Sequence, residues 1–284
     1  MSSIENYIIF NGKILKHKAF TLKTSNRSFL YGDGLFESIR VIDGTPLFLY
    51  DHLSRLHSGM KLLKMSFEYD IIPDFENLFY ELLKANKIDT GAYIRLNVFR
   101  KDGGKYLPTN RNVDFLIEIF RIQNEFLLQT QKVTLGIFSD LLKPINILNL
   151  IKSNNAQFFV MASIYASENN FDEVLILNEN KQIIEATSSN LFAIIGNKLI
   201  SPPLDSGVLP GIMRKQVLKL CDELGFEILE QCPTQSQLIE ADEIFLTNAI
   251  IGIKAVDFFI NKNYAKTQST KLLQKISLIK DTSL

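Results

Sequence analysis

The sequence predicts a mixed α/β fold of the α+β type, divided into two domains, and three observations support this. Strand-like and helix-like apolar segments follow one another along the chain, without the regular strand–helix–strand order of a parallel sheet. The chain has 284 residues, enough for one large or two ordinary domains. Residues 121–130 lose the strand pattern, so we place a linker there, between domains at 1–120 and 131–284.

Composition excludes several classes of protein. The content of 46% hydrophobic and 22% charged residues is typical of a globular protein, and 31 basic residues balance 31 acidic ones. This balance gives no net field for nucleic acid or a membrane surface, and we see neither a signal peptide nor a membrane-spanning run. The two cysteines and three histidines lack disulfide or metal-site spacing. We expect a cytoplasmic protein without a metal, nucleic-acid partner or membrane partner.

The first 120 residues predict a hairpin, further strands and two helices. Asn11-Gly12 suits a tight turn between two short strands. Residues 26–42 begin as a glycine-containing turn and continue as a strand. Asp51 is placed to cap a helix over 52–64, because apolar residues then recur at helical spacing. The remaining predicted elements are a helix over 73–85 and strands over 93–99 and 113–120.

The chain beyond residue 130 alternates short strands with helices. The predicted strands cover 133–138, 174–177, 191–195, 226–228 and 244–246, and the predicted helices cover 154–168, 211–224 and 267–279.

The stretch from 181 to 214 carries two features that point to a bound ligand. Glu185 lies between apolar strands, where a carboxylate is costly unless a cation meets it. Gly211 follows Pro210 and opens a helix, so bare backbone N–H groups are available to an anion. A zwitterionic phosphorylated cofactor would require both features.

Four other positions offer chemistry, and each has an ordinary structural alternative. Lys152 follows an apolar run; desolvation would make it a Schiff-base nucleophile, whereas the alternative is an exposed lysine. Arg55, among core leucines, suits a phosphate or simply solvent. Thr247-Asn248-Ala249 offers a hydroxyl and amides at a strand end, or an ordinary turn. Gly103-Gly104-Lys105 is a basic loop that could be a lid with a carboxylate binder, or a turn.

Taken together, six segments resemble the class IV aminotransferases, the fold-type IV pyridoxal-phosphate enzymes. The segments, in the order and spacing of that family, are YGDGLFES (31–38), HLSRL (52–56), IKSNN (151–155), EATSSNLF (185–192), GVLPGIMR (207–214) and LTNAIIGI (246–253). The resemblance implies a small N-terminal α/β domain and a larger C-terminal α/β pseudo-barrel domain. It also implies a homodimer with the active site between the domains, partly closed by the neighbouring subunit.

The resemblance further implies pyridoxal 5'-phosphate as cofactor and assigns its ligands. Lys152 would hold the cofactor covalently and, as the catalytic residue, move the α-proton, while Glu185 would pair with the pyridine nitrogen at the opposite end of the ring. Leu209 would pack on a ring face. The phosphate ligands would be Arg55, Gly211, Ile212, Met213, Thr247, Asn248 and Ala249.

Within the family, the sequence ranks 4-amino-4-deoxychorismate lyase first, an enzyme of folate biosynthesis that forms 4-aminobenzoate and pyruvate. The segment VFRKDGGKY at 98–106 resembles the lyase loop, although Lys105 stands for an arginine and one glycine is missing. Gln157 stands where branched-chain enzymes place a tyrosine, and Arg100 lacks the Arg-x-His pattern of D-amino-acid enzymes. Tyr31, Arg100 and Lys105 would bind the substrate. A branched-chain or D-amino-acid transaminase using 2-oxoglutarate is the alternative, followed by a non-catalytic binding protein of the same fold.

Overall fold

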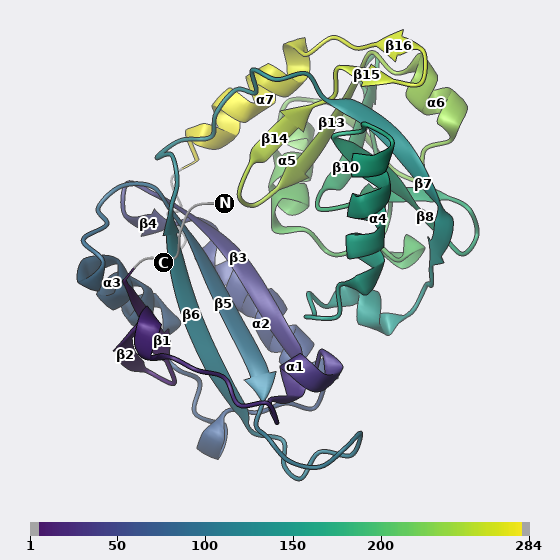
Figure 1. Ribbon diagram of the computed structural model, residues 1–284. Helices are drawn as coiled ribbons and strands as arrows, with labels where there is room; N and C mark the ends of the chain where they lie inside the picture. The colour runs from purple at the N-terminus through teal and green to yellow at the C-terminus, as the bar shows by residue number, and fades with distance from the viewer. Residues whose placement is uncertain (1–5, 280–284) are drawn as a thin grey trace. The chain divides into compact units, whose positions relative to one another are not determined.

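The computed structural model describes residues 6–279 and divides them into two compact units, each of mixed α/β type as predicted (Figure 1). Unit 1 comprises residues 6–125 and 151–155, and unit 2 comprises 126–150 and 156–279. The chain leaves unit 1 between Glu125 and Phe126, within the linker range 121–130. The return of 151–155 to unit 1 has no counterpart in the contiguous division expected from the sequence.

Unit 1 is built on a six-stranded sheet in which every paired strand is antiparallel. Its order is β2-β1-β6-β5-β3-β4, and the predicted turn at Asn11-Gly12 joins β1 to β2 with positive φ at both residues. The strands are β1 (Tyr7–Phe10), β2 (Lys13–Lys16), β3 (Gly34–Ile42), β4 (Thr45–Pro46), β5 (Ala92–Arg100) and β6 (Val113–Arg121).

Two helices, α2 (Leu49–Leu62) and α3 (Phe75–Ala85), pack on unit 1's sheet and bury its core (Figure 1). Alternate residues of β3 point to this core, and those between them, such as Phe36 and Ser38, point to the other face. The predicted cap Asp51 is wrong: α2 begins earlier, after Phe48, and Asp51 lies in its first turn. An acid there still favours the helix N-terminus electrostatically.

The turn predicted before β3 contains a short helix, α1 (Arg27–Tyr31). The Asn26 side chain accepts a hydrogen bond from the Phe29 N–H at its start, and Gly32 ends it in the left-handed conformation, with φ 65°. Unit 1 also has single 3-10 turns at His17–Ala19 and Glu68–Asp70.

Residues 151–155 attach to β3 by backbone hydrogen bonds. The Phe36 N–H donates to the Lys152 carbonyl, and the Asn154 N–H donates to the Gly34 carbonyl, both at 2.9 Å. Ile151 joins unit 1's apolar core. Lys152 is therefore held against the beginning of β3 by its own backbone.

Unit 2 contains a ten-stranded sheet with both parallel and antiparallel pairs. The pairs β7–β8, β11–β12 and β7–β15 are parallel, and the remaining pairs are antiparallel. The strands are β7 (Thr134–Lys143), β8 (Glu173–Asn178), β9 (Ile183–Ala186), β10 (Asn190–Ile195), β11 (Lys198–Ser201), β12 (Glu227–Glu230), β13 (Glu243–Asn248), β14 (Gly252–Ala255), β15 (Phe258–Phe259) and β16 (Lys262–Asn263).

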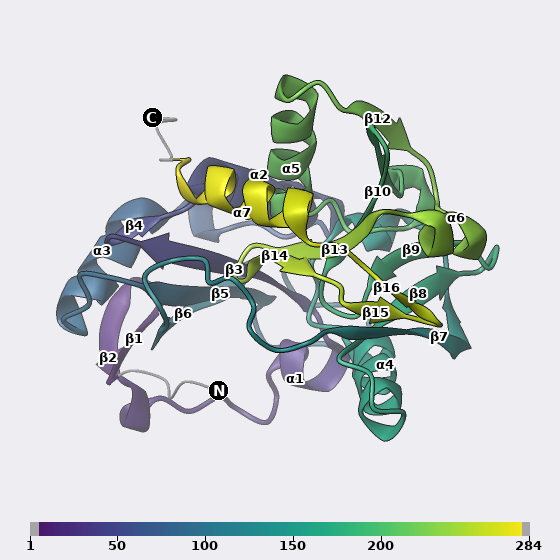
Figure 2. The ribbon, with the colours of Figure 1, turned by 90° about the horizontal axis from the view of Figure 1, so that it is seen from above.

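Four helices pack against unit 2's strands, and α7 lies along β14 and β13 (Figure 2). The sequence predicts three of them and misses α6, which begins with a capping box formed by Thr234 and Gln237. The helices are α4 (Gln157–Glu168), α5 (Ile212–Glu223), α6 (Gln235–Glu240) and α7 (Thr267–Ser277), with 3-10 turns at Ile147–Leu150 and Leu204–Ser206. Across residues 6–279, every helix is too short or too polar to cross a membrane.

Candidate active site

The register of three strands brings predicted cofactor-binding residues of unit 2 into one row. Asn190 at the start of β10 lies opposite Glu185 of β9 on one side and Thr247 of β13 on the other. The Asn190 amide donates to the Thr247 carbonyl at 2.8 Å and to its hydroxyl at 2.9 Å. Glu185 and Thr247 are therefore neighbours of one asparagine, although 62 positions separate them in the numbering of the sequence.

The N-terminus of α5 approaches this row closely. Gly211 is its N-cap, and no side chain caps the helix. A Cβ built on Gly211 would lie 2.1 Å from Asn190 Oδ1, so only glycine fits without a shift. The side chains of Ile212 and Met213 are buried, so these residues can bind a ligand only through their backbone N–H groups. An uncapped helix start beside Asn190 and Thr247 suits a phosphate.

Glu185 has the cation that its burial requires, and that cation is Lys143 at the end of β7. The Lys143 ammonium donates to Glu185 Oε1, and the Leu209 N–H donates to Oε2 at 3.3 Å. Both charged side chains are about 10% exposed. The sequence predicts a cation for Glu185 but does not identify Lys143, whose only local signal is its place at the end of an apolar strand. Leu209, expected on a ring face, is half-buried.

The turn after β13 is folded around Asn248. The Asn248 side-chain oxygen accepts from the N–H groups of Ile250 at 3.0 Å and Ile251 at 2.8 Å, and its amide donates to the Ser188 carbonyl and the Ser189 hydroxyl. This network fixes the backbone around Ala249. The two polar stretches of unit 2 that the sequence singles out are therefore joined.

In unit 1, the charged groups of Lys152 and Arg95 both lie over the aromatic ring of Phe36. The Lys152 Nζ lies 4.6 Å from the centroid of the Phe36 ring, and the Arg95 guanidinium carbon lies 4.3 Å from the same centroid. Arg95 is on β5, opposite Ser38, and thus on the sheet face that α2 does not cover. Sequence reasoning missed Arg95; the strand alternation of Tyr93, Arg95 and Asn97 was the signal that could have found it.

Arg55 of α2 is held by a buried acid. Its Nε donates to Glu37 Oε1 at 2.8 Å and its Nη2 to Glu37 Oε2 at 2.6 Å. The side chain is 10% exposed. Neither alternative weighed from the sequence, phosphate or solvent, included this partner.

Arg100, predicted to bind the substrate, is used inside unit 1. Its Nε donates to Asp33 at 2.9 Å, its Nη2 to the Leu63 carbonyl at 2.8 Å, and its Nη1 to the Lys64 carbonyl at 3.3 Å. The residue is 6% exposed. These contacts tie the end of β5 to the end of α2.

The basic loop after β5 is fastened by Arg27, which shares Asp33 with Arg100. The Arg27 Nη1 donates to the carbonyls of Gly103 at 3.0 Å and Lys105 at 2.6 Å. This anchor leaves the Lys105 side chain exposed and places the Tyr106 ring 5.7 Å from that of Tyr31. Two predicted substrate-binding residues, Tyr31 and Lys105, therefore belong to one ordered surface of unit 1.

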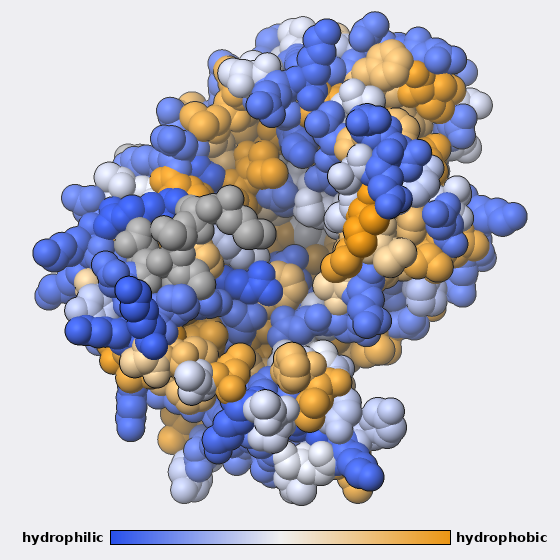
Figure 3. Space-filling view, in the orientation of Figure 1, coloured by the Kyte–Doolittle hydropathy of each residue, from blue (hydrophilic) through white to orange (hydrophobic). Residues whose placement is uncertain are grey.

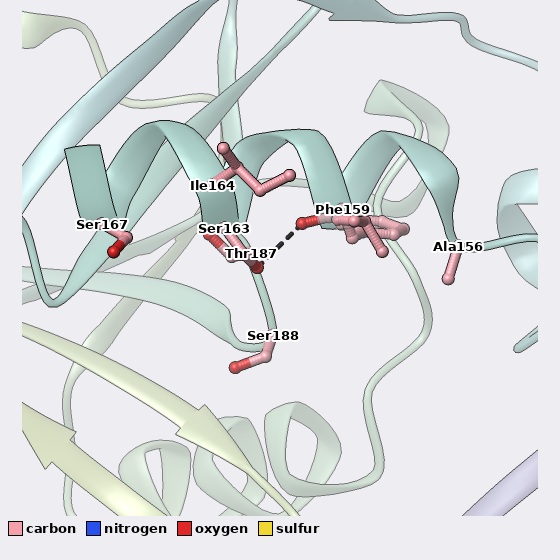
Figure 4. Close-up of a pocket in the computed structure, with 8 residues that line it drawn as sticks. Ala156, Phe159, Ser163, Ile164, Ser167, Thr187 and Ser188 are labelled. Atoms are coloured by element: carbon pink, nitrogen blue, oxygen red, sulfur yellow. Dashed lines mark hydrogen bonds between the residues drawn. The ribbon is translucent and has the colours of Figure 1, made fainter. Parts of the chain in front are cut away.

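An apolar groove of about 440 Å³ runs along α4 in unit 2 (Figure 4). Phe159 and Ile164 line it from the helix, and Thr187 and Ser188 line it from the turn between β9 and β10. Within the helix the Ser163 hydroxyl donates to the Phe159 carbonyl at 2.8 Å, so its polar group is satisfied locally. Val160, Met161 and Ile164 are about half exposed, and Figure 3 shows the apolar surface over this helix.

Comparison with known proteins decides the family. The family model described as amino-transferase class IV matches residues 34–257. The chain belongs to the class IV aminotransferases. It is therefore a member of a family of pyridoxal-phosphate enzymes, as the six sequence segments imply.

Relatives of this class IV aminotransferase carry the names of different activities. A Methanocaldococcus jannaschii protein with the provisional name branched-chain-amino-acid aminotransferase is 31% identical over 94% of both chains. An aminodeoxychorismate lyase of Vibrio harveyi is 28% identical over 81% of this chain and 84% of its own. The crystal structure of the Escherichia coli branched-chain amino acid aminotransferase superposes with a TM-score of 0.86 at 25% identity, covering 98% of this chain and 97% of that one.

The residues of this class IV aminotransferase fit its cofactor. By residue type, Lys152 would offer an amine to the cofactor aldehyde, Glu185 an acid to the pyridine nitrogen, and the start of α5 N–H groups to the phosphate. Because glycine has no side chain, position 211 leaves that helix start accessible.

Proposed function

We propose that this class IV aminotransferase is a 4-amino-4-deoxychorismate lyase, which splits its substrate into 4-aminobenzoate and pyruvate. The observation that supports this choice is the anchored loop of unit 1, in which the exposed Lys105 directly precedes Tyr106, whose ring pairs with that of Tyr31. A cation and two aromatic faces suit a cyclic, carboxylated substrate. A small aliphatic amino acid would leave them without a partner.

In the proposed reaction, Lys152 removes the proton from the carbon that bears the substrate's amino group. Pyridoxal phosphate, when bound, supplies a ring that accepts the electrons released at that carbon. Loss of pyruvate then leaves an aromatic ring, which drives the step forward. The Glu185 carboxylate accepts hydrogen bonds from Lys143 and the Leu209 N–H and is placed to accept one from the pyridine N–H as well.

The other cofactor contacts in the proposal follow the sequence expectation. Leu209 packs on the cofactor ring. The phosphate is held by the side chains of Arg55 and Thr247, and by backbone groups at Gly211, Ile212, Met213, Asn248 and Ala249.

For the substrate carboxylate, Arg95 takes the place that the sequence assigned to Arg100. Arg95 lies over the same ring as Lys152, whereas the three Arg100 donors named above already bind Asp33 and two carbonyls. Arg95→Gln should raise KM by about 10- to 100-fold, because a charge-assisted hydrogen bond contributes about 1.5–3 kcal/mol. An unchanged KM for every substrate tested would remove Arg95 from the site.

A branched-chain amino-acid transaminase that uses 2-oxoglutarate is the second candidate. The names of two relatives, one of them 31% identical over 94% of this chain, favour it. The early steps of both reactions use the same residues. They differ in whether the substrate loses pyruvate or exchanges its amino group with a keto acid.

The deciding assay supplies the enzyme with 4-amino-4-deoxychorismate alone, and separately with leucine or D-alanine plus 2-oxoglutarate. We expect 4-aminobenzoate and pyruvate in equal amounts in the first reaction, measured by fluorescence and by a lactate dehydrogenase coupling. Lys152→Ala should lower this turnover by about 10⁴-fold or more, since it removes the proton-transferring group. Turnover in the second reactions only would overturn the lyase and establish the transaminase.

We also propose that the enzyme is a homodimer associated through the apolar face of α4. The helix has apolar residues on all sides, and Val160, Met161 and Ile164 remain half exposed, as expected of a covered surface. Light scattering should give twice the 32.4 kDa mass of the chain, and Ile164→Glu should give the monomer. A monomeric wild-type protein would contradict this assignment.

A further inference from the structure

In unit 1, the buried acid Glu37 contacts two residues of α2, His52 and Arg55. Glu37, on β3, is 1% exposed. His52 and Arg55, three positions apart on α2, both face it, as residues at this spacing share one side of a helix. His52 Nδ1 lies 2.6 Å from Glu37 Oε2, the same oxygen that Arg55 Nη2 contacts.

The charge of Glu37 is held by its partners. Burial alone would raise the pKa of Glu37, but the charges of Arg55 and His52, together with hydrogen bonds from both residues, outweigh it and lower the pKa to about 2. The carboxylate therefore remains ionised at neutral pH, although it is sealed from water.

His52 supplies a donor to this acid. The residue is 1% exposed, and within residues 6–279 its Nε2 is buried without a hydrogen-bond partner. A ring that carries a proton on Nδ1 donates it to the Glu37 carboxylate.

The geometry fixes one side of the Arg55 guanidinium. Nε and Nη2 form a two-point contact with both Glu37 oxygens, and because the guanidinium is planar, this contact sets the direction of Nη1 and of the second Nη2 proton. A lysine would have no such constraint, since its ammonium rotates on a flexible stem.

We infer that Glu37, supported by His52, is a positioning residue that holds Arg55 in the orientation in which it meets the cofactor phosphate. This inference rests on the proposed role of Arg55 as a phosphate ligand. The competing explanation is that Glu37 only fastens α2 to β3. The affinity for phosphate distinguishes these two explanations. A purely structural role of Glu37 would weaken the binding of ligands with and without a phosphate equally.

The test compares two probes, pyridoxal 5'-phosphate and pyridoxal, which differ only in the phosphate. Cofactor-free protein is titrated with each, and binding is followed by visible absorbance. The ratio of the two dissociation constants measures the contribution of the phosphate. Arg55→Gln should lower this ratio about 100-fold, as expected for loss of a charge-assisted phosphate contact.

Glu37→Gln should lower the ratio about 10-fold, with pyridoxal binding unchanged, and Glu37→Asp should lower it by a smaller factor. Arg55→Lys should fail to restore the ratio, because the ammonium cannot make the two-point contact. Glu243→Gln is the matched control. Glu243 is a buried acid of unit 2 that binds the Gln268 and Ser269 N–H groups, and its replacement should leave the ratio unchanged.

Two results would overturn the inference. Equal loss of both probes in Glu37→Gln would assign Glu37 a purely structural role, and an unchanged ratio in Arg55→Gln would remove Arg55 from the phosphate site. If Glu37→Gln does not fold, Glu37→Asp decides by the same ratio. In all these cases, wild-type protein that binds the cofactor and turns over substrate keeps the proposed function; wild type that does neither refutes that function instead.

Discussion

Glu37 in unit 1 and Glu185 in unit 2 are both buried acids on strands, and they are stabilised in different ways. Glu37 has a bidentate arginine and a histidine from one helix. Glu185 has a lysine from the end of β7 and one backbone N–H from Leu209. The side chain of Glu37 is 1% exposed and that of Glu185 is 9% exposed.

The difference shows which of the two acids can change partners. Arginine in a two-point contact is fixed in plane and direction, whereas a lysine ammonium is a point charge on four flexible methylene groups. Glu185 can therefore turn toward a ligand while Lys143 follows. Glu37 can serve a ligand only through the residue that it holds. We expect Glu37 variants to lower stability and phosphate recognition, and Glu185 variants to lower mainly turnover.

The largest expected effect is on stability. Glu37→Ala leaves Arg55 and His52 buried without their acid, and removal of one partner from a buried ion pair costs about 3–5 kcal/mol. Urea unfolding followed by circular dichroism measures this loss. A triple variant that also replaces His52 and Arg55 by leucine should regain most of it, because the three polar side chains of this contact are removed together. If Glu37→Ala lowered the free energy of unfolding by less than about 1 kcal/mol, Glu37 would not be the stabilising acid described here.

Glu185→Gln should lower kcat about 100-fold, equivalent to about 2.7 kcal/mol, because the pyridine nitrogen loses its ionised partner. Its unfolding free energy should change less than that of Glu37→Ala. Steady-state kinetics and urea unfolding on the same preparation give both numbers. If Glu185→Gln were as active as wild type, its role as the partner of the pyridine nitrogen would be wrong.

Lowering the pH should isolate the contribution of the ionised Glu37 carboxylate to the free energy of unfolding. Its pKa is lowered from 4.5 to about 2, so its contribution to stability is complete above pH 4.5 and is lost as the pH falls toward 2. Between pH 4.5 and 2.5 this amounts to about 2 kcal/mol by proton linkage. Unfolding free energies measured across this range should fall more steeply for wild type than for Glu37→Gln, and parallel curves would refute the assignment.

The smallest expected effect concerns the start of α5. A Cβ at Gly211 would lie 2.1 Å from Asn190 Oδ1, a side chain that is able to move, so Gly211→Ala should weaken binding of pyridoxal phosphate only about 10-fold. Adding Asn190→Ala should recover part of this loss by making room. Equal weakening of pyridoxal by Gly211→Ala would show that the phosphate is not involved.

Much of the fold follows from local patterns. The β1–β2 hairpin follows from Asn11-Gly12, and β3 from its alternation, because both depend on neighbours in the sequence. The start of α2 was misplaced because Phe48, an apolar residue in a left-handed conformation, caps the helix instead of Asp51. No rule based on capping side chains selects a phenylalanine there.

The sequence singles out candidate residues whose signal lies in a short segment. It does not identify contacts between residues that are distant in the sequence. Glu185, Gly211 and Thr247 stood out by their local surroundings. Lys143 contacts Glu185 across 42 positions, and Glu37 contacts Arg55 across 18. Such pairs are set by strand register and helix packing, which local patterns of polarity do not specify.

Within residues 6–279 the polypeptide passes between the two units three times, at 125/126, 150/151 and 155/156, because the five residues 151–155 carry Lys152 to β3. The backbone that carries Lys152, the proposed catalytic residue, is thus encoded downstream of the strand to which it is hydrogen-bonded. A fragment beginning at residue 126 would contain the lysine without the strand edge that holds it. Splitting this enzyme at its first crossing should therefore give two pieces that must recombine before either contributes to catalysis.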